Sequence, residues 1–316
     1  MRVADQFLFG YDDGHRLLTG SRELAPATAV SLLAATDAAM ADGAAPLVTG
    51  LALAESSEYA FCVTWSATES PRPGAVWAHA LIVAQADLDD PHALEVLIGL
   101  PRRPHTGGIY LGDYRAALPL DGVTPAAPRY LPAGALDLEL LERLALAAYD
   151  PGADTIVTHD EISDAAKALI ALWRAQWPSL RTAFSFRTRH VVRQGAGGFD
   201  LTVTRKVRGQ AADGAPATAT APRPWLAGVV EDAAATGTQP TPLRDFLWTF
   251  GPLEPRDPRR VAALATLWRA IVARDAAGAR AQLEREWPAP QSGAELKAVL
   301  FAPENDDWWA LSEPAR

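Results

Sequence analysis

The chain has 316 residues, with 29 basic and 38 acidic side chains and a formal net charge of −9. Apolar residues make up 49% and charged residues 21% of the chain, which is typical of a globular protein, and the length suggests about two domains. The acidic balance argues against a protein that coats nucleic acid, and the single cysteine, Cys62, excludes an internal disulfide and any zinc site built on paired cysteines.

Short strands and helices alternate along the first hundred residues. The predicted strands cover residues 6–9, 15–18, 47–53, 59–65 and 75–84, and the predicted helices cover residues 26–40 and 91–99. An Asp- and Gly-rich turn between the first two strands predicts a hairpin. The strands at 59–65 and 75–84 flank a turn rich in Pro and Gly, which is typical of antiparallel neighbours.

Two more helices are predicted before the chain returns to strand patterns. They cover residues 136–148 and 160–177, and apolar residues recur every three or four positions in the second. Residues 184–189 then alternate as a strand does. Residues 199–207 are a plausible partner strand, across the Gly-rich turn at 195–198.

The composition changes after residue 210. Residues 211–242 are rich in Ala, Gly, Thr and Pro, which predicts a linker or a long exposed loop. Beyond it, residues 243–316 carry helical patterns, clearest at 257–271 and 276–287. We therefore predict an α+β fold with a mixed, largely antiparallel sheet and packed helices over residues 1–210, followed by a smaller helical region.

Common catalytic motifs are absent from the sequence. A P-loop needs a glycine-rich turn followed by Lys and Ser or Thr, and the three lysines (Lys167, Lys206 and Lys297) stand in other settings, so the chain is not itself a P-loop GTPase or ATPase. The dinucleotide-binding, zincin and α/β-hydrolase motifs are missing too. We expect no cofactor and no metal.

No targeting segment is visible in the sequence. The N-terminus has no apolar stretch of the length that a secretory signal needs, and no segment approaches the roughly 20 apolar residues of a membrane span. The sequence therefore predicts a cytoplasmic protein without a membrane partner.

A turn near the N-terminus holds the densest group of polar residues. His15 follows Asp12 and Asp13, and a carboxylate beside an imidazole can orient it and favour its charged form, which suits a general base. Alternatively, the carboxylates cap backbone N–H groups of a hairpin turn and His15 only begins a strand. A second histidine, His79, lies within an apolar strand, where a histidine usually forms hydrogen bonds inside the core. The chemistry of Cys62 is suppressed if its apolar neighbours bury it.

A basic stretch covers residues 181–208, where the local net charge is about +6 in a chain of −9. In a strand, Arg187 and Arg189 share one face, and Arg205 and Lys206 follow on the next strand. Such a surface could bind a phosphate, a nucleic acid or an acidic partner protein. A solvated sheet face is the alternative.

An ordered series of motifs resembles the type 1 N-terminal domain of GTPase-associated protein one. The motifs are residues 5–18 with Ser21, the pair at 64–65, residues 72–79 and residues 102–104. Positions 75 and 78, often Cys and Thr in that family, are both Ala here. The resemblance implies a component of bacterial GTPase-centred conflict systems of anti-phage defence, encoded with a GTPase, and it brings no catalytic residues to transfer.

Three hypotheses follow for the function. The first is a non-catalytic adaptor that couples a GTPase to an effector, and the second is an uncharacterised hydrolase or phosphate- or nucleic-acid-processing enzyme that uses His15 and His79 with Asp12 or Asp13. The third is a GTPase-activating role through an inserted arginine, Arg16 or Arg72. The residues predicted to bind a partner or ligand are Tyr11, Arg16, Arg72, Trp77, Arg187, Arg189, Arg205 and Lys206.

Overall fold

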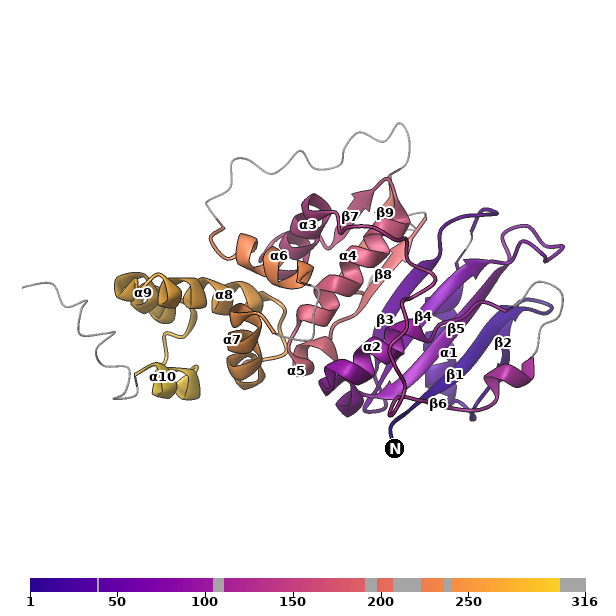
Figure 1. The fold of residues 1–316 in the computed structure, drawn as a ribbon, viewed down its shortest axis with the longest axis horizontal. Coiled ribbons are helices and arrows are strands. Elements are labelled where there is room, and N and C mark those ends of the chain that lie inside the picture. The colour runs from indigo at the N-terminus through magenta and orange to yellow at the C-terminus, as the bar shows by residue number, and fades with distance from the viewer. Residues whose placement is uncertain (39, 105–110, 191–197, 207–222, 236–239, 302–316) are drawn as a thin grey trace, which may run out of the picture.

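A computed structural model describes residues 1–38, 40–104, 111–190, 198–206, 223–235 and 240–301 (Figure 1). In this part of the chain nine strands form one mixed sheet in the order β2-β1-β5-β4-β3-β8-β9-β7, with β6 pairing beside β1. The strands are β1 (Val3–Tyr11), β2 (His15–Gly20), β3 (Leu47–Leu53), β4 (Glu58–Ser66), β5 (Val76–Ala84), β6 (Leu118–Pro119), β7 (Ile156–His159), β8 (Phe186–Arg189) and β9 (Leu201–Arg205).

The strand directions confirm the predicted α+β class. The pairs along β2-β1-β5-β4-β3-β8 are antiparallel, as is the pair of β6 with β1, whereas β9 runs parallel to both β8 and β7. The predicted hairpin of β1 and β2 is present. The predicted pairing of β8 with β9 is present too. The two strands run parallel, however, whereas a tight turn between them would have made an antiparallel hairpin.

The helices of the described residues are α1 (Pro26–Thr36), α2 (Pro91–Gly99), α3 (Leu138–Tyr149), α4 (Ile162–Ala175), α5 (Pro178–Arg181), α6 (Leu226–Ala234), α7 (Pro242–Phe250), α8 (Arg259–Val272), α9 (Ala276–Glu286) and α10 (Ala294–Leu300), with short 3-10 turns η1 (Gln85–Asp89), η2 (Leu111–Tyr114) and η3 (Gly251–Leu253). The six helices predicted with bounds, which are α1, α2, α3, α4, α8 and α9, begin and end within four residues of the predicted positions, and the structure adds four more. Side-chain caps explain several of the starts. Asp90, Asp137, Thr241 and Asp275 accept hydrogen bonds from backbone N–H groups in the first turns of α2, α3, α7 and α9.

Helices cover both faces of the sheet. Helix α1 lies on one face and buries Leu32 there, while α4 packs on the other. The indole of Trp173 in α4 stacks on the rings of Tyr59 and Phe61 with centroids 5.3 and 5.7 Å apart, and it also meets the ring of Phe186. Because these aromatic side chains are almost fully buried, the centre of the main core lies between α4 and strands β4 and β8.

The segment predicted as a linker contains a helix. Helix α6 occupies residues 226–234 and packs against α3 and α4, burying Leu226 and Val229. This corrects the prediction for that part of residues 211–242: the Ala- and Gly-rich composition hid a short apolar face that is buried only when the helix meets its neighbours.

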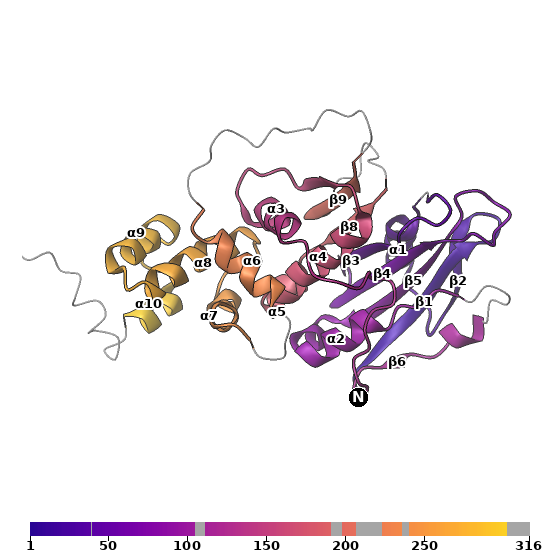
Figure 2. The same cartoon turned by 45° about the horizontal axis from the view of Figure 1, so that its top comes forward.

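Both views place α7 to α10 at the end of the molecule opposite to β2 (Figure 1, Figure 2).

One buried arginine joins the sheet region to these C-terminal helices. The guanidinium of Arg181 donates to the carbonyls of Leu88, Arg174 and Gln176, and it lies 5.5 Å from the ring centre of Trp248 in α7. Burial lowers the pKa of Arg181 to about 10. The side chain is therefore a structural element of the core.

Among the helices that the structure describes, none combines the length and the apolar character needed to cross a membrane.

Candidate functional site

His79 is held in the core by hydrogen bonds at both ring nitrogens. Its Nδ1 accepts from the backbone N–H of Arg102 at 3.1 Å, and its Nε2 lies 3.1 Å from Oε1 of Gln6. The amide nitrogen of Gln6 donates to the carbonyls of Asp113 and Ala116, so Oε1 is left to accept from His79. The pKa of His79 is lowered to about 3, mainly by burial and to a smaller extent by the positive charge of Arg102. The imidazole is therefore neutral, fully buried and committed to structure.

His15 lies on the opposite face of the sheet. It pairs with Tyr11 across the hairpin, on the face that carries Phe9, while His79 pairs with Leu8 on the other face. Its Nε2 lies 3.0 Å from the hydroxyl of Thr36 in α1, and burial lowers its pKa. The structure therefore does not bring His15 and His79 together, and the enzyme hypothesis that joined them loses its geometric basis.

The turn between β1 and β2 is organised around its own residues. Asp12 forms an ion pair with Arg16, and Asp13 adopts a left-handed φ of 54°. In the described residues neither carboxylate bonds to His15, so the predicted carboxylate-oriented base is not formed. The exposed guanidinium of Arg72 lies 4.6 Å from the ring centre of the partly buried Tyr11, which places two of the predicted binding residues side by side.

Trp77, another predicted binding residue, is buried and takes part in a polar network. Its Nε1 donates to Glu69 at 2.6 Å, and Arg103 donates to the same carboxylate at 2.5 Å and to the carbonyl of Ser66 at 3.0 Å. Burial raises the pKa of Glu69, but the hydrogen bonds from its own backbone, Trp77 and Arg103 outweigh that effect and leave the pKa lowered. Trp77 therefore positions Glu69, and through it Arg103, with its indole N–H.

A cavity of about 450 Å³ opens beside this network. Its lining residues come from the end of β4, the segment after α2, η2 and the loop before α3: Trp65, Pro101, Arg102, Arg103, Pro104, Asp113, Tyr114, Arg129 and Tyr130. We call it the arginine cavity. Three arginines and one carboxylate in this lining make it locally positive in a chain of net charge −9.

The sequence indicated only part of this cavity. The segment 102–104 belongs to the motifs that carry the family resemblance, yet no role was assigned to its arginines. Asp113, Tyr114 and Arg129 were missed because they lie in segments without strand or helix periodicity, and nothing in their spacing relates them to residue 102. The feature of the sequence that could have pointed to the cavity is the density of Arg, Tyr and Pro in these loops.

The basic stretch at 181–208 does not form one open surface. Arg181 is fully buried and Arg187 is only 5% exposed. Arg187 lies 4.2 Å from the ring centre of Phe199, and burial together with the charge of Arg189 lowers its pKa to about 10. Arg187 and Arg189 do share a face, as predicted, and Arg205 and Lys206 are exposed at the end of β9. A phosphate or nucleic-acid site here finds no support.

Cys62 and the metal-ligating side chain types of the described residues offer no further candidate site. Cys62 is buried, and burial raises the pKa of its thiol to about 12, which suppresses thiolate chemistry at neutral pH. Within the described ranges no group of three or more His, Cys, Asp or Glu side chains is arranged to hold a metal ion.

Residues 3–100 match the family model of GTPase-associated protein 1, N-terminal domain type 1. This confirms the resemblance seen in the motifs and indicates a GTPase-associated role. The match covers β1 to α2, including Gln6, Trp77 and His79, and ends two residues before Arg102. No curated protein matches the chain significantly.

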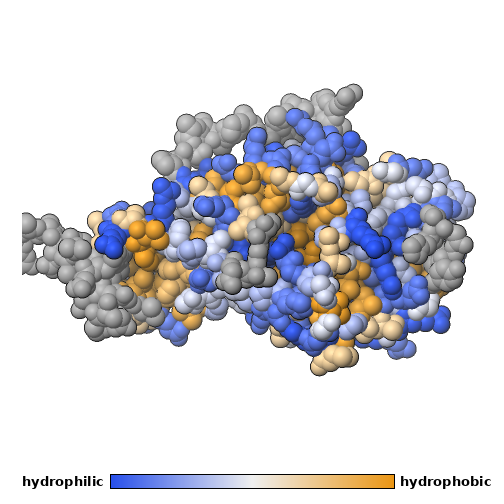
Figure 3. Space-filling model, in the orientation of Figure 1, coloured by the Kyte–Doolittle hydropathy of each residue, from blue (hydrophilic) through white to orange (hydrophobic). Residues whose placement is uncertain are grey.

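A second concave surface lies outside the matched segment, between α3 and α6. This groove of about 980 Å³ has apolar residues in its lining (Leu138, Leu146, Leu226, Ala227, Val230 and Ala234) and three glutamates (Glu139, Glu142 and Glu231). Figure 3 shows apolar surface over α3 and α6 in this region. Leu138 is 54% exposed, and the one arginine of the groove, Arg223, is ion-paired with Asp150. The groove is therefore apolar with an acidic rim.

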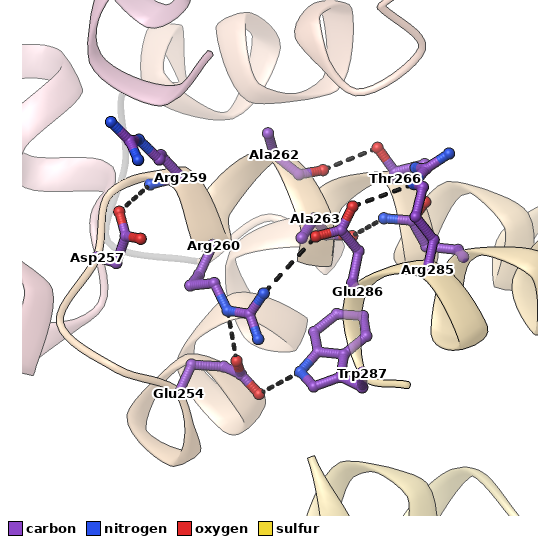
Figure 4. A network of polar contacts seen from close by, with 11 residues as sticks. Glu254, Asp257, Arg259, Arg260, Ala262, Ala263, Thr266, Arg285, Glu286 and Trp287 are labelled. Carbon is purple, nitrogen blue, oxygen red and sulfur yellow. Dashed lines mark hydrogen bonds and ion pairs between the residues drawn. The ribbon is translucent and has the colours of Figure 1, made fainter. Parts of the chain in front are cut away.

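The C-terminal helices carry a separate polar network (Figure 4). Glu254 accepts from Nε1 of Trp287 at 2.8 Å and from Nε of Arg260 at 2.7 Å, and the guanidinium of Arg260 lies 5.0 Å from the ring centre of Trp287. Arg260 and Arg285 also form ion pairs with Glu286. Because Glu254 and Trp287 are buried, this network fixes η3 to the end of α9.

Proposed function

We propose that this protein is a non-catalytic adaptor, cytoplasmic and part of a bacterial GTPase-centred conflict system of anti-phage defence, which couples a GTPase to an effector. The observation that carries the proposal is the match of residues 3–100 to a domain of GTPase-associated proteins. A chain without a P-loop leaves nucleotide hydrolysis to its partner. The separation of His15 and His79 by the sheet also favours binding over catalysis.

The groove between α3 and α6 is the surface that we assign to the GTPase partner. Its glutamates Glu139, Glu142 and Glu231 are exposed, and none has an ion-pair partner among the described residues. An apolar groove with an acidic rim is complementary to an amphipathic helix that carries Lys or Arg beside its apolar face. The occupant that we propose is such a basic amphipathic helix of the GTPase.

Co-purification tests the proposal. The full chain is co-expressed with the GTPase encoded beside it, and the mixture is analysed by size-exclusion chromatography without nucleotide, with GDP and with a non-hydrolysable GTP analogue. We expect co-elution in at least one nucleotide state. If the two proteins elute separately in all three, the adaptor proposal is wrong.

A charge-reversal variant tests the groove itself. Glu142→Lys combined with Glu231→Lys should weaken the complex about tenfold or more, since it places like charges against a basic helix. Glu284→Lys is the matched control, because Glu284 is exposed on α9 outside the groove. A complex that survives the groove variant with unchanged affinity means that the partner binds elsewhere.

A further inference from the structure

We propose that the arginine cavity binds a small phosphorylated molecule that carries a planar ring, the chemistry of a nucleotide. The cavity lies beside the network that joins Glu69, Trp77 and Arg103, and its volume of about 450 Å³ falls in the range of sites that bind small molecules. The inference concerns a ligand of this chain alone and does not depend on a GTPase partner.

Two of the three arginines are available to an anion. Arg103 is neutralised by Glu69 at 2.5 Å. Arg102 donates to the backbone carbonyl of Asp113 and lies 4.9 Å from the ring centre of Tyr114, but it has no carboxylate partner among the described residues. Arg129 is exposed and has no hydrogen bond or ion pair within the described part of the chain. Two guanidinium groups that line one cavity and are not ion-paired with a carboxylate can bind a phosphate through several charge-assisted hydrogen bonds.

The walls of the cavity supply aromatic surface. Trp65, Tyr114 and Tyr130 are each less than 10% exposed, and all three belong to the packed core. The hydroxyl of Tyr130 donates to the carbonyl of Ile98 at 2.9 Å, and that of Tyr114 lies 3.4 Å from the carbonyl of Arg102. Because these hydroxyls are committed, the tyrosines contribute ring surface more than polar groups, and such surface favours a planar ring.

One carboxylate completes the set of polar groups. Asp113 is exposed, lines the cavity and has no side-chain partner among the described residues. A free carboxylate repels a phosphate, but it accepts hydrogen bonds from sugar hydroxyls, as acidic residues do in dinucleotide-binding folds. Two arginines, aromatic walls and one carboxylate therefore match the phosphate, the base and the ribose of one nucleotide.

Contacts with buried side chains hold two of the segments that line the cavity in place before any ligand arrives. The backbone N–H of Arg102 is fixed by Nδ1 of His79, and the backbone carbonyl of Asp113 is fixed by the amide of Gln6. The ring of Tyr114 meets the ring of His79 edge-on, with centroids 5.0 Å apart. These contacts anchor the two segments that carry Arg102 and Asp113 to the central strands β1 and β5, which reduces the entropy lost on binding.

Isothermal titration calorimetry on the full chain tests the inference. The probes are AMP and GMP, with inorganic phosphate and adenosine as partial ligands. We expect at least one nucleotide to bind, and phosphate or adenosine alone to bind about tenfold more weakly or worse. The proposal is overturned if neither nucleotide binds at millimolar concentration. It is also overturned if phosphate alone binds as tightly as a nucleotide, because the ring would then add nothing.

Variants locate the site. Arg129→Gln should weaken nucleotide binding about tenfold, the usual effect of losing one charge-assisted hydrogen bond, and Arg102→Gln combined with it should weaken binding further. Arg115→Gln is the matched control, because Arg115 is an exposed arginine next to η2 that does not line the cavity. Arg129 has no described partner, so its replacement should leave the melting temperature unchanged. Binding that persists in the double variant would place the ligand elsewhere and refute the assignment.

Discussion

Gln6 and His79 hold each other in fixed orientations across strands β1 and β5. Oε1 of Gln6 lies 3.1 Å from Nε2 of His79, while the amide nitrogen of Gln6 is bound to two backbone carbonyls. The proton of the neutral imidazole therefore sits on Nε2, and Nδ1 remains free to accept from Arg102. One residue pair thus aligns two strands and the segment that borders the arginine cavity.

The first prediction concerns the pH dependence of stability. The pKa of His79 in the folded protein is about 3, below the ordinary value of 6.5, so protonation favours the unfolded state. The free energy of unfolding should be unaffected by His79 above about pH 6.5, and below it this residue should cost roughly 1.4 kcal/mol per pH unit as the pH falls toward 4. Urea denaturation at several pH values measures this slope. His79→Gln is the comparison, and an equal slope in both proteins would contradict the prediction.

The second prediction concerns close packing at Gly10. A Cβ atom there would lie 2.2 Å from Cζ3 of Trp77 and 2.9 Å from Cδ1 of Leu18. Gly10→Ala should therefore lower the free energy of unfolding by about 1–3 kcal/mol, because the indole must shift in a packed cluster. Gly112→Ala is the control, since nothing lies within 4 Å of its Cβ position. Equal urea midpoints for the two variants would show that Trp77 moves without cost.

The third prediction concerns the network in Figure 4. Glu254→Gln keeps the shape of the side chain but replaces one acceptor oxygen by an NH2 group, which faces a donor from Trp287 or Arg260. The free energy of unfolding should fall by about 1–3 kcal/mol. Glu284→Gln, on the exposed side of α9, should leave it unchanged. Denaturation followed by tryptophan fluorescence gives both values, and a Glu254 variant as stable as the control would refute the role of the network.

Much of the fold could be predicted from the sequence because its elements have strong local patterns. Runs of apolar, β-branched and aromatic residues located β4 and β5, and their antiparallel pairing followed from the short turn between them. Strand direction at β8 and β9 could not be predicted in the same way, since a two-residue period is the same for parallel and antiparallel strands. Helix α6 was hidden for a related reason: its stability comes from packing on α3 and α4 more than from its own composition.

The site was harder to predict than the fold. His79 was correctly favoured as a core histidine, because an isolated histidine in an apolar strand usually satisfies its nitrogens there. Whether it could meet His15 depended on the pairing register, which assigns the two rings to opposite faces and which no local pattern encodes. The arginine cavity depended on loops whose contacts, such as that of Arg102 with Tyr114, form only in the folded chain.

Arg181 has a consequence for any attempt to divide this protein. A fragment that stopped before α7 would lose Trp248, over which the guanidinium lies, and would uncover the ring of Trp177, which packs against Gly251. In the whole chain, the side chains of Arg181 and Trp177 are both fully buried. Arg181 and Trp177 therefore join the sheet region to α7 and η3, and expression trials should not end the chain before these elements.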